Sequence, residues 1–290
     1  MRGAEPLEQP DAATAQAYLD VLPDVRRRAE GVLDLRRLGR LYIVEGVALA
    51  AFLGVLLWTD LLHRQRGGLN SSWVYGLLVL MVLWSGLGRG IRERYGARQG
   101  MHGVTRILNL ALLVIATLGA AAVIFVGTAA PVWLRTVPVV FALVGGALPG
   151  VALFRDARGT PRFDPPDHAV MTRAGRVATL VCGMILSATG FALGWAVVGG
   201  DLASTLALLF DVVAMFIIAI CSRMGLVTEV GAMWRPLQWT AFALSALIIG
   251  AAMVQAMAAP ERGLVIGGIA AGAILVLFVV AALWPAGPDA

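Results

Sequence analysis

The sequence predicts an all-α, polytopic helical membrane protein, and its composition and its long apolar runs lead to that fold class. The 290 residues are 59% hydrophobic and only 14% charged, and the mean hydropathy is +0.81. Soluble domains carry about 25% charged residues, so this chain lacks the polar surface that water requires. Its apolar residues form continuous runs, whereas a membrane β-barrel would show short alternating segments.

Eight apolar runs follow the polar start of the chain, and each is long enough to cross a bilayer core as a helix. Every tryptophan lies near an end of one of these runs, as expected for indole rings at the membrane interface. The runs are expected at residues 41–59, 72–88, 107–127, 131–153, 177–198, 202–221, 238–258 and 263–284.

The arginines indicate the orientation of the chain in the membrane. All 23 basic residues are arginines, and nineteen of them lie in the first forty residues or in the connections after the second, fourth and sixth runs. Arg64, Arg66, Arg135 and Arg262 lie on the other side. Because basic loops stay in the cytoplasm, both termini are predicted to be cytoplasmic, in a plasma or inner cell membrane.

This topology divides the chain into five regions. Residues 1–40 are predicted to be a cytoplasmic extension, either an amphipathic helical segment or a weakly structured basic leader. The remaining regions are a first four-helix half at 41–153, a cytoplasmic linker loop at 154–176, a second half at 177–284 and a short cytoplasmic tail at 285–290.

A repeated pattern suggests that the two halves are copies. Residues 37–40 read Arg-Leu-Gly-Arg and residues 173–176 read Arg-Ala-Gly-Arg, and each pattern precedes an apolar run that ends near a tryptophan. Aligning the two patterns also brings Gly46 near Gly183. We interpret this as a 4+4 parallel repeat, as in some transporters. The alternative is that any two helices entering from the cytoplasm begin with arginine and end with an aromatic residue.

Pairs of glycines four residues apart allow the backbones of membrane helices to approach closely. Three such pairs are expected to serve helix packing: Gly146 with Gly150, Gly190 with Gly194, and Gly268 with Gly272.

Asp211 is the most informative single residue, because it lies near the middle of the sixth run with no charged neighbour in sequence. An ionised carboxylate is costly at that depth, so the side chain should face the bundle, be paired or be protonated. Arg135 enters from the same side of the membrane and is the candidate partner. These two residues form the candidate intramembrane polar site, either a coupling site for protons or cations or a structural contact.

Glu45 lies closer to the cytoplasmic boundary than Asp211 does. Helical rise places it at the depth of Arg106 and Asn109, near the start of the third run, so these three residues form a second candidate polar cluster. The different depths of Glu45 and Asp211 disfavour a catalytic pair of carboxylates, which requires hydrogen-bond reach.

No set of catalytic residues is predicted, and the chain is expected to need no cofactor. The sequence contains no Walker lysine, Gly-x-Ser-x-Gly, His-Glu-x-x-His or Cys-x-x-Cys motif. Asp164, Asp167 and His168 resemble metal ligands, but a metal site needs three or four converging donors. We therefore predict no metal site, and an intramembrane enzyme is the least favoured of the possible functions.

Two functions remain open at this stage. The first is a small permease, or the membrane subunit of a transport system, for an apolar or amphipathic substrate. The second is a membrane-embedded interaction or signalling protein that binds a cytoplasmic or membrane partner through residues 1–40 and the basic inner loops. The net charge of +5 is attributed to anionic lipid headgroups at the cytoplasmic face, and no nucleic-acid partner is expected.

Overall fold

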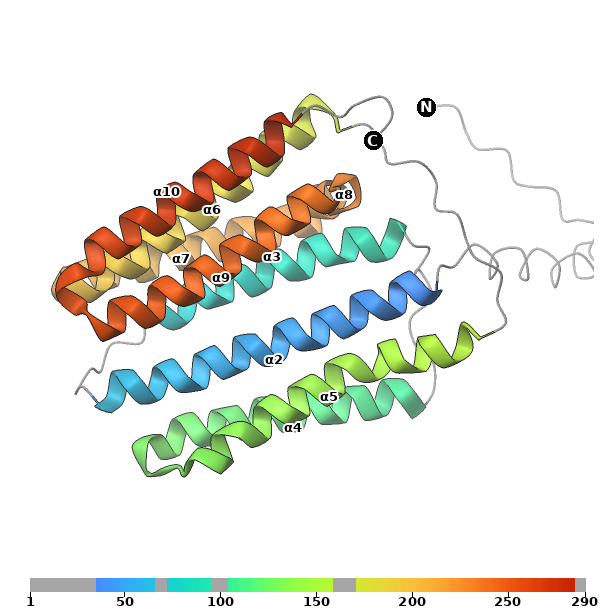
Figure 1. Ribbon diagram of the computed structural model, residues 1–290, viewed down its shortest axis with the longest axis horizontal. Coiled ribbons are helices and arrows are strands. Elements are labelled where there is room, and N and C mark those ends of the chain that lie inside the picture. The colour runs from blue at the N-terminus through green and yellow to red at the C-terminus, as the bar shows by residue number, and fades with distance from the viewer. Residues whose placement is uncertain (1–34, 66–71, 95–103, 159–170, 285–290) are drawn as a thin grey trace, which may run out of the picture.

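The computed structural model describes residues 35–65, 72–94, 104–158 and 171–284, and every regular element in these ranges is helical (Figure 1). The long helices are α2 (Leu35–Gln65), α3 (Ser72–Arg94), α4 (Val104–Val126), α5 (Val132–Asp156), α6 (Arg173–Val198), α7 (Gly200–Arg223), α9 (Pro236–Ala258) and α10 (Gly263–Leu283). The short elements are η1 (Gly127–Ala129), α8 (Leu226–Met233) and η2 (Pro260–Arg262). Most of the predicted extension, most of the linker loop and the C-terminal tail lie outside the described residues.

Seven of these helices are long and apolar enough to span a membrane, namely α2, α4, α5, α6, α7, α9 and α10 together with η2. The second expected run, at residues 72–88, forms α3, which lies alongside the other helices (Figure 1). The last turns of α3 carry the charged residues Arg89, Arg92, Glu93 and Arg94. Large apolar side chains cover the outside of the bundle, and Phe125 is 92% exposed. Such a surface is stable in lipid and not in water, so the chain is a multi-pass membrane protein.

The long helices form two groups (Figure 1). The smaller group consists of α2, α4, α5 and η1, and within it α5 packs along both α2 and α4. The larger group consists of α3 and α6 to α10, in which α6 packs along α10 and α3 packs on α6, α7 and α8. The second helix of the predicted first half therefore packs mainly with the second half. From the smaller group, α2 contacts the larger group through α3 and α9.

Glycines bring the backbones of α2 and α5 into contact. A Cβ atom on Gly46 would lie 2.5 Å from the backbone nitrogen of Ala147, and a Cβ atom on Gly146 would lie 2.5 Å from the Cα atom of Gly46. Gly150 lies one turn after Gly146 on α5, and Gly39 lies two turns before Gly46 on α2. A Cβ atom on Gly150 would collide with the backbone oxygen of Gly39 in the same way. No larger residue fits at these positions without moving a helix, so the predicted role of Gly146 and Gly150 in packing is confirmed.

Glycines also bring the backbones of α6 and α10 into contact. A Cβ atom on Gly194 would collide with the backbone oxygen of Gly263, and one on Gly267 would lie 3.0 Å from the Cα atom of Gly194. The prediction for Gly268 and Gly272 is wrong, because a Cβ atom on either residue would meet nothing within 4 Å. Both glycines point away from the helices that α10 packs against.

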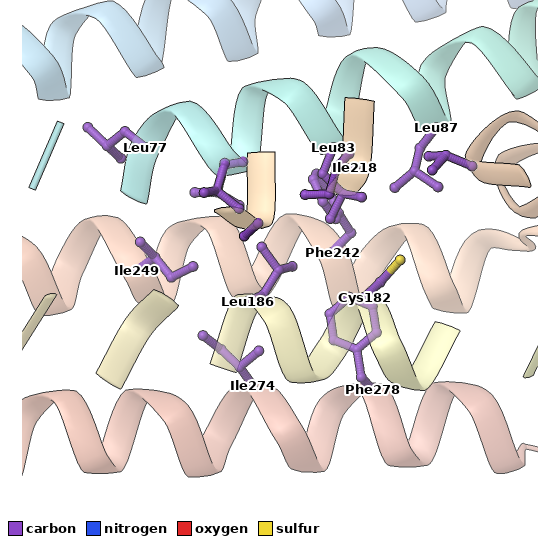
Figure 2. Close-up of a cluster of buried hydrophobic side chains, with 14 of the residues drawn as sticks. Leu77, Leu83, Leu87, Cys182, Leu186, Ile218, Phe242, Ile249, Ile274 and Phe278 are labelled. Atoms are coloured by element: carbon purple, nitrogen blue, oxygen red, sulfur yellow. The ribbon is translucent and has the colours of Figure 1, made fainter. Parts of the chain in front are cut away.

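Each group has its own apolar core. The core of the smaller group lies where α2, α4 and α5 meet, around Leu57, Val123 and Ala142. Figure 2 shows the core of the larger group, in which side chains from α3, α6, α7, α9 and α10 interlock. The residues labelled there are Leu77, Leu83, Leu87, Cys182, Leu186, Ile218, Phe242, Ile249, Ile274 and Phe278.

One tryptophan is enclosed by other side chains of the protein. Trp234, between α8 and α9, is buried, with its ring 5.2 Å from that of Trp239 and 6.1 Å from that of Phe278. Its Nε1–H donates to the hydroxyl of Thr179 on α6 at 3.0 Å. The ring belongs to the core because α8, a short helix that the hydropathy pattern does not reveal, holds it there.

Substitution of Gly46 by alanine tests the role of the α2–α5 contact. Gly46→Ala places a methyl group against the backbone of Ala147, and overpacking of this kind costs about 1–3 kcal/mol. We expect a lower melting temperature for the protein in detergent. Gly268→Ala is the matched control and should leave the melting temperature unchanged, since nothing lies within 4 Å of that position. Equal effects of the two substitutions would contradict the packing role.

Candidate functional site

Asp211 lies near the middle of α7 and is 1% exposed. Its Oδ1 atom accepts a hydrogen bond from the hydroxyl of Thr189 on α6, at 3.3 Å. Within the described part of the chain, Asp211 forms no ion pair. A carboxyl group is therefore held at mid-helix depth by one neutral hydroxyl, without a neighbouring cation.

The surroundings of Asp211 come from three helices. Thr189 is itself fully buried, and its methyl group would lie 3.2 Å from a Cβ atom on Gly76 of α3. The side chain of Leu193 lies equally close to that position. Gly76 therefore lets α3 approach α6 next to the carboxyl group. Asp211 and Thr189 thus lie where a helix of the predicted first half crosses two helices of the second half.

Arg135 lies in the smaller group, in the second turn of α5, and is 1% exposed. One terminal nitrogen donates to the backbone oxygen of Leu57 on α2 at 3.2 Å, and the other donates to the backbone oxygen of Gly127 in η1. Gly127 has φ +69°, a conformation that glycine adopts without strain. This conformation lets the chain turn after α4 so that a carbonyl oxygen reaches the guanidinium group.

A second arginine and an acid lie beside Arg135. Asp60, one turn beyond Leu57 on α2, accepts a hydrogen bond from Nε of Arg64 at 2.9 Å. Arg64 in turn lies against Gly127, the residue that Arg135 binds. The Oδ2 atom of Asp60 and the Nε atom of Arg135 are buried without a hydrogen-bond partner. Sequence reasoning missed Asp60, because its position near the end of an apolar run suggested an interfacial residue.

The structure does not bring Arg135 and Asp211 together. Arg135 binds backbone oxygens of α2 and η1 within the smaller group, while Asp211 binds Thr189 within the larger group. The predicted contact rested on entry from the same side of the membrane, but this does not determine which helices are neighbours.

Glu45 has a different partner from the predicted one. Its Oε2 atom forms an ion pair with Arg92 of α3, at 3.1 Å from NH1. The guanidinium of Arg92 also lies 5.9 Å from the ring centroid of Tyr42 on α2. Asn109 is partly buried, and its Oδ1 atom has no hydrogen-bond partner. The side chain of Arg106 lies outside the described residues, so its predicted place in this cluster stays a prediction.

Most other buried hydroxyl groups bond to nearby backbone. Thr59, Ser204 and Ser245 each donate to the carbonyl oxygen four residues earlier in the same helix. Gln238 accepts from the backbone N–H of Arg235 and donates to the backbone oxygen of Ala281 at 2.6 Å. These side chains are already satisfied, so they offer little to a hydrophilic ligand.

In the described ranges, no three His, Cys, Asp or Glu side chains converge as metal ligands would. Cys182 and Cys221 are both free thiols. What remains for chemistry is a buried carboxyl group that can bind and release a proton or a cation.

No known protein family matches the chain, and neither a characterised protein nor a solved structure is significantly similar to it. The residues and their geometry are therefore the basis of the functional argument.

A double-mutant cycle tests whether Arg135 and Asp211 act separately. The stability losses of Arg135→Gln and Asp211→Asn should add to within about 0.5 kcal/mol, as for sites that share no partner. The measurement is the free energy of unfolding of both single variants and the double variant in mixed micelles. A coupling energy well above that value would show that the two residues interact after all.

Proposed function

We propose that this protein is a small permease, or the membrane subunit of a transport system, in which Asp211 binds the coupling proton or cation. The observation that carries the proposal is the complete burial of this carboxyl group beside a single hydroxyl group, with no cation from the described residues paired to it. An ionisable group at such a depth is expensive to keep, and intramembrane acids most often serve ion or proton pathways.

The position of Asp211 supports the same function. In transporters built from repeats, coupling sites lie near the bilayer midplane at the contact between the repeats. Asp211 lies near the middle of α7, where α3 of the predicted first half packs on α6 and α7 of the second. The site therefore belongs to both proposed halves.

The packing of equivalent helices favours the 4+4 repeat as part of this proposal. In each half the first helix packs along the fourth through glycines, α2 on α5 and α6 on α10. Gly46 and Gly183, which the sequence alignment pairs, both face the fourth helix of their own half. The proposed protein lies in the cell membrane, crosses it eight times and has both termini in the cytoplasm. Its arginines on the cytoplasmic side contact anionic headgroups.

The substrate class follows from what the interior offers. The hydroxyl groups of Thr59, Ser204 and Ser245 are bonded to their own helices, and the two core clusters of the described chain are apolar. A hydrophilic solute would lose its hydration without receiving hydrogen bonds in return. An apolar or amphipathic substrate loses far less, so we propose that class. The alternative function, partner binding through residues 1–40, depends chiefly on residues outside the described ranges.

Infrared spectroscopy tests proton binding without knowledge of the substrate. A protonated Asp211 should give a carbonyl stretching band of a buried carboxylic acid that disappears in Asp211→Asn. Asn keeps the shape of the side chain and an oxygen for Thr189, so the fold should survive. Asp201→Asn, in the exposed first turn of α7, is the matched control and should keep the band. Absence of the band from the wild type throughout a pH titration would exclude Asp211 as a proton carrier.

Transport itself can be measured with an amphipathic fluorescent dye in proteoliposomes under an imposed pH gradient. We expect gradient-dependent dye movement with the wild type and with Asp201→Asn. Asp211→Asn should fall to the rate of protein-free liposomes, because an amide cannot take up the proton. Equal rates for Asp211→Asn and the wild type would contradict the coupling role.

A further inference from the structure

The two helix groups are held together internally by backbone contacts. Glycines join α2 to α5 in the smaller group, and Gly194 joins α6 to α10 in the larger group. In the larger group, α3 and α8 are also joined by glycines. A Cβ atom on Gly90 of α3 would collide with the backbone oxygen of Thr228 on α8, and one on Gly231 of α8 would collide with the backbone oxygen of Leu87 on α3. Close-packed backbones resist sliding and separation, so the contacts of α2 with α5, of α6 with α10 and of α3 with α8 are the most rigid ones within the two groups.

The contact between the groups, where α2 meets α3 and α9, is built differently, and we call it the seam. The α2 glycines Gly39, Gly46 and Gly54 have α5 atoms as the nearest neighbours of an added Cβ, so they belong to the α2–α5 contact. At the seam, the apolar side chains Phe52 and Leu56 of α2 pack against the larger core. Side chains rather than backbones keep the helices together here.

The cytoplasmic part of the seam carries the ion pair between Glu45 and Arg92. Gly88, one turn from Arg92 on α3, makes room for it, since a Cβ atom on Gly88 would lie 3.0 Å from Oε1 of Glu45. Tyr42 adds its ring below the guanidinium group. Both charged side chains are partly exposed, the side chain of Glu45 by 15% and that of Arg92 by 28%. Because the side chain of Arg92 keeps solvent access, the two charges can be rehydrated when they separate, without either helix unfolding.

We propose that the seam is the moving joint of this protein and that the Glu45–Arg92 pair is the latch that closes its cytoplasmic side. The two groups move as rigid bodies about α2, and separation of the pair opens the joint toward the cytoplasm. Rigid-body motion of packed units across a weaker contact is a common form of conformational change. The proposal depends on the packing of the two groups and not on Asp211, so it can fail while the proposed function stands, or the reverse.

Pulsed electron paramagnetic resonance in nanodiscs measures the distance across the joint. Cys182 and Cys221 are first replaced by serine, and spin labels are attached at Asp156→Cys on α5 and Met224→Cys after α7. Both positions are exposed and lie in different groups. Glu45→Gln and Arg92→Gln should each add a population at longer distance. The reversed pair, Glu45→Arg with Arg92→Glu, should bring the distribution back toward that of the wild type.

Two controls separate opening from loss of fold. Labels at Arg173→Cys and Met224→Cys lie within the larger group, and their distance should stay unchanged in every variant. Arg64→Gln breaks the ion pair with Asp60 inside α2 and should leave the distance between Asp156 and Met224 as it is. The proposal is overturned if the single variants do not change that distance, if they change both label pairs equally, or if the reversed pair does not restore it.

Discussion

The architecture depends on one constraint, which is that helices in a bilayer gain nothing from hiding apolar side chains from lipid that is equally apolar. Their association requires close van der Waals contact, and small residues supply it. Here such close approaches occur at Gly46 with Gly146, at Gly194 with Gly263, and at Gly90 with Thr228. These backbone contacts explain why the chain forms two compact groups joined by a looser seam.

The same medium determines how polar groups are accommodated. Lipid supplies no hydrogen bonds, so each buried polar atom needs a protein partner. Arg135 finds carbonyl oxygens that the end of α4 and the body of α2 leave available, and this makes a buried cation tolerable. Asp211 receives one hydroxyl hydrogen bond, which is poor compensation for an anion. The contrast suggests that Arg135 is structural, whereas Asp211 is retained at a cost that a function would justify.

Hydropathy was sufficient to predict where the helices lie, since bilayer thickness fixes the length of each span. It did not reveal α8, which is too short to span. Lateral packing was harder, because sequence gives the depth of a residue but not the direction in which its side chain points. Two pairs of glycines look alike in sequence, Gly146 with Gly150 and Gly268 with Gly272. The first pair contacts the backbone of α2, whereas nothing lies within 4 Å of a Cβ atom placed on either residue of the second pair. For the same reason, Glu45 pairs with Arg92 on α3 and Asp211 with Thr189, not with residues chosen by depth.

The placement of α3 has a consequence for biosynthesis. This helix is the second of the long described helices in chain order, but α6, α7 and α8, on which it packs, are made only after α4 and α5. Until then Gly76, Gly86 and Gly90 of α3 lack the neighbours they pack against. The last turns of α3 also carry four charged residues, Arg89, Arg92, Glu93 and Arg94. The smaller group can close as soon as α5 is inserted, whereas α3 must wait for later helices. Assembly of the larger group therefore does not follow the order of the chain.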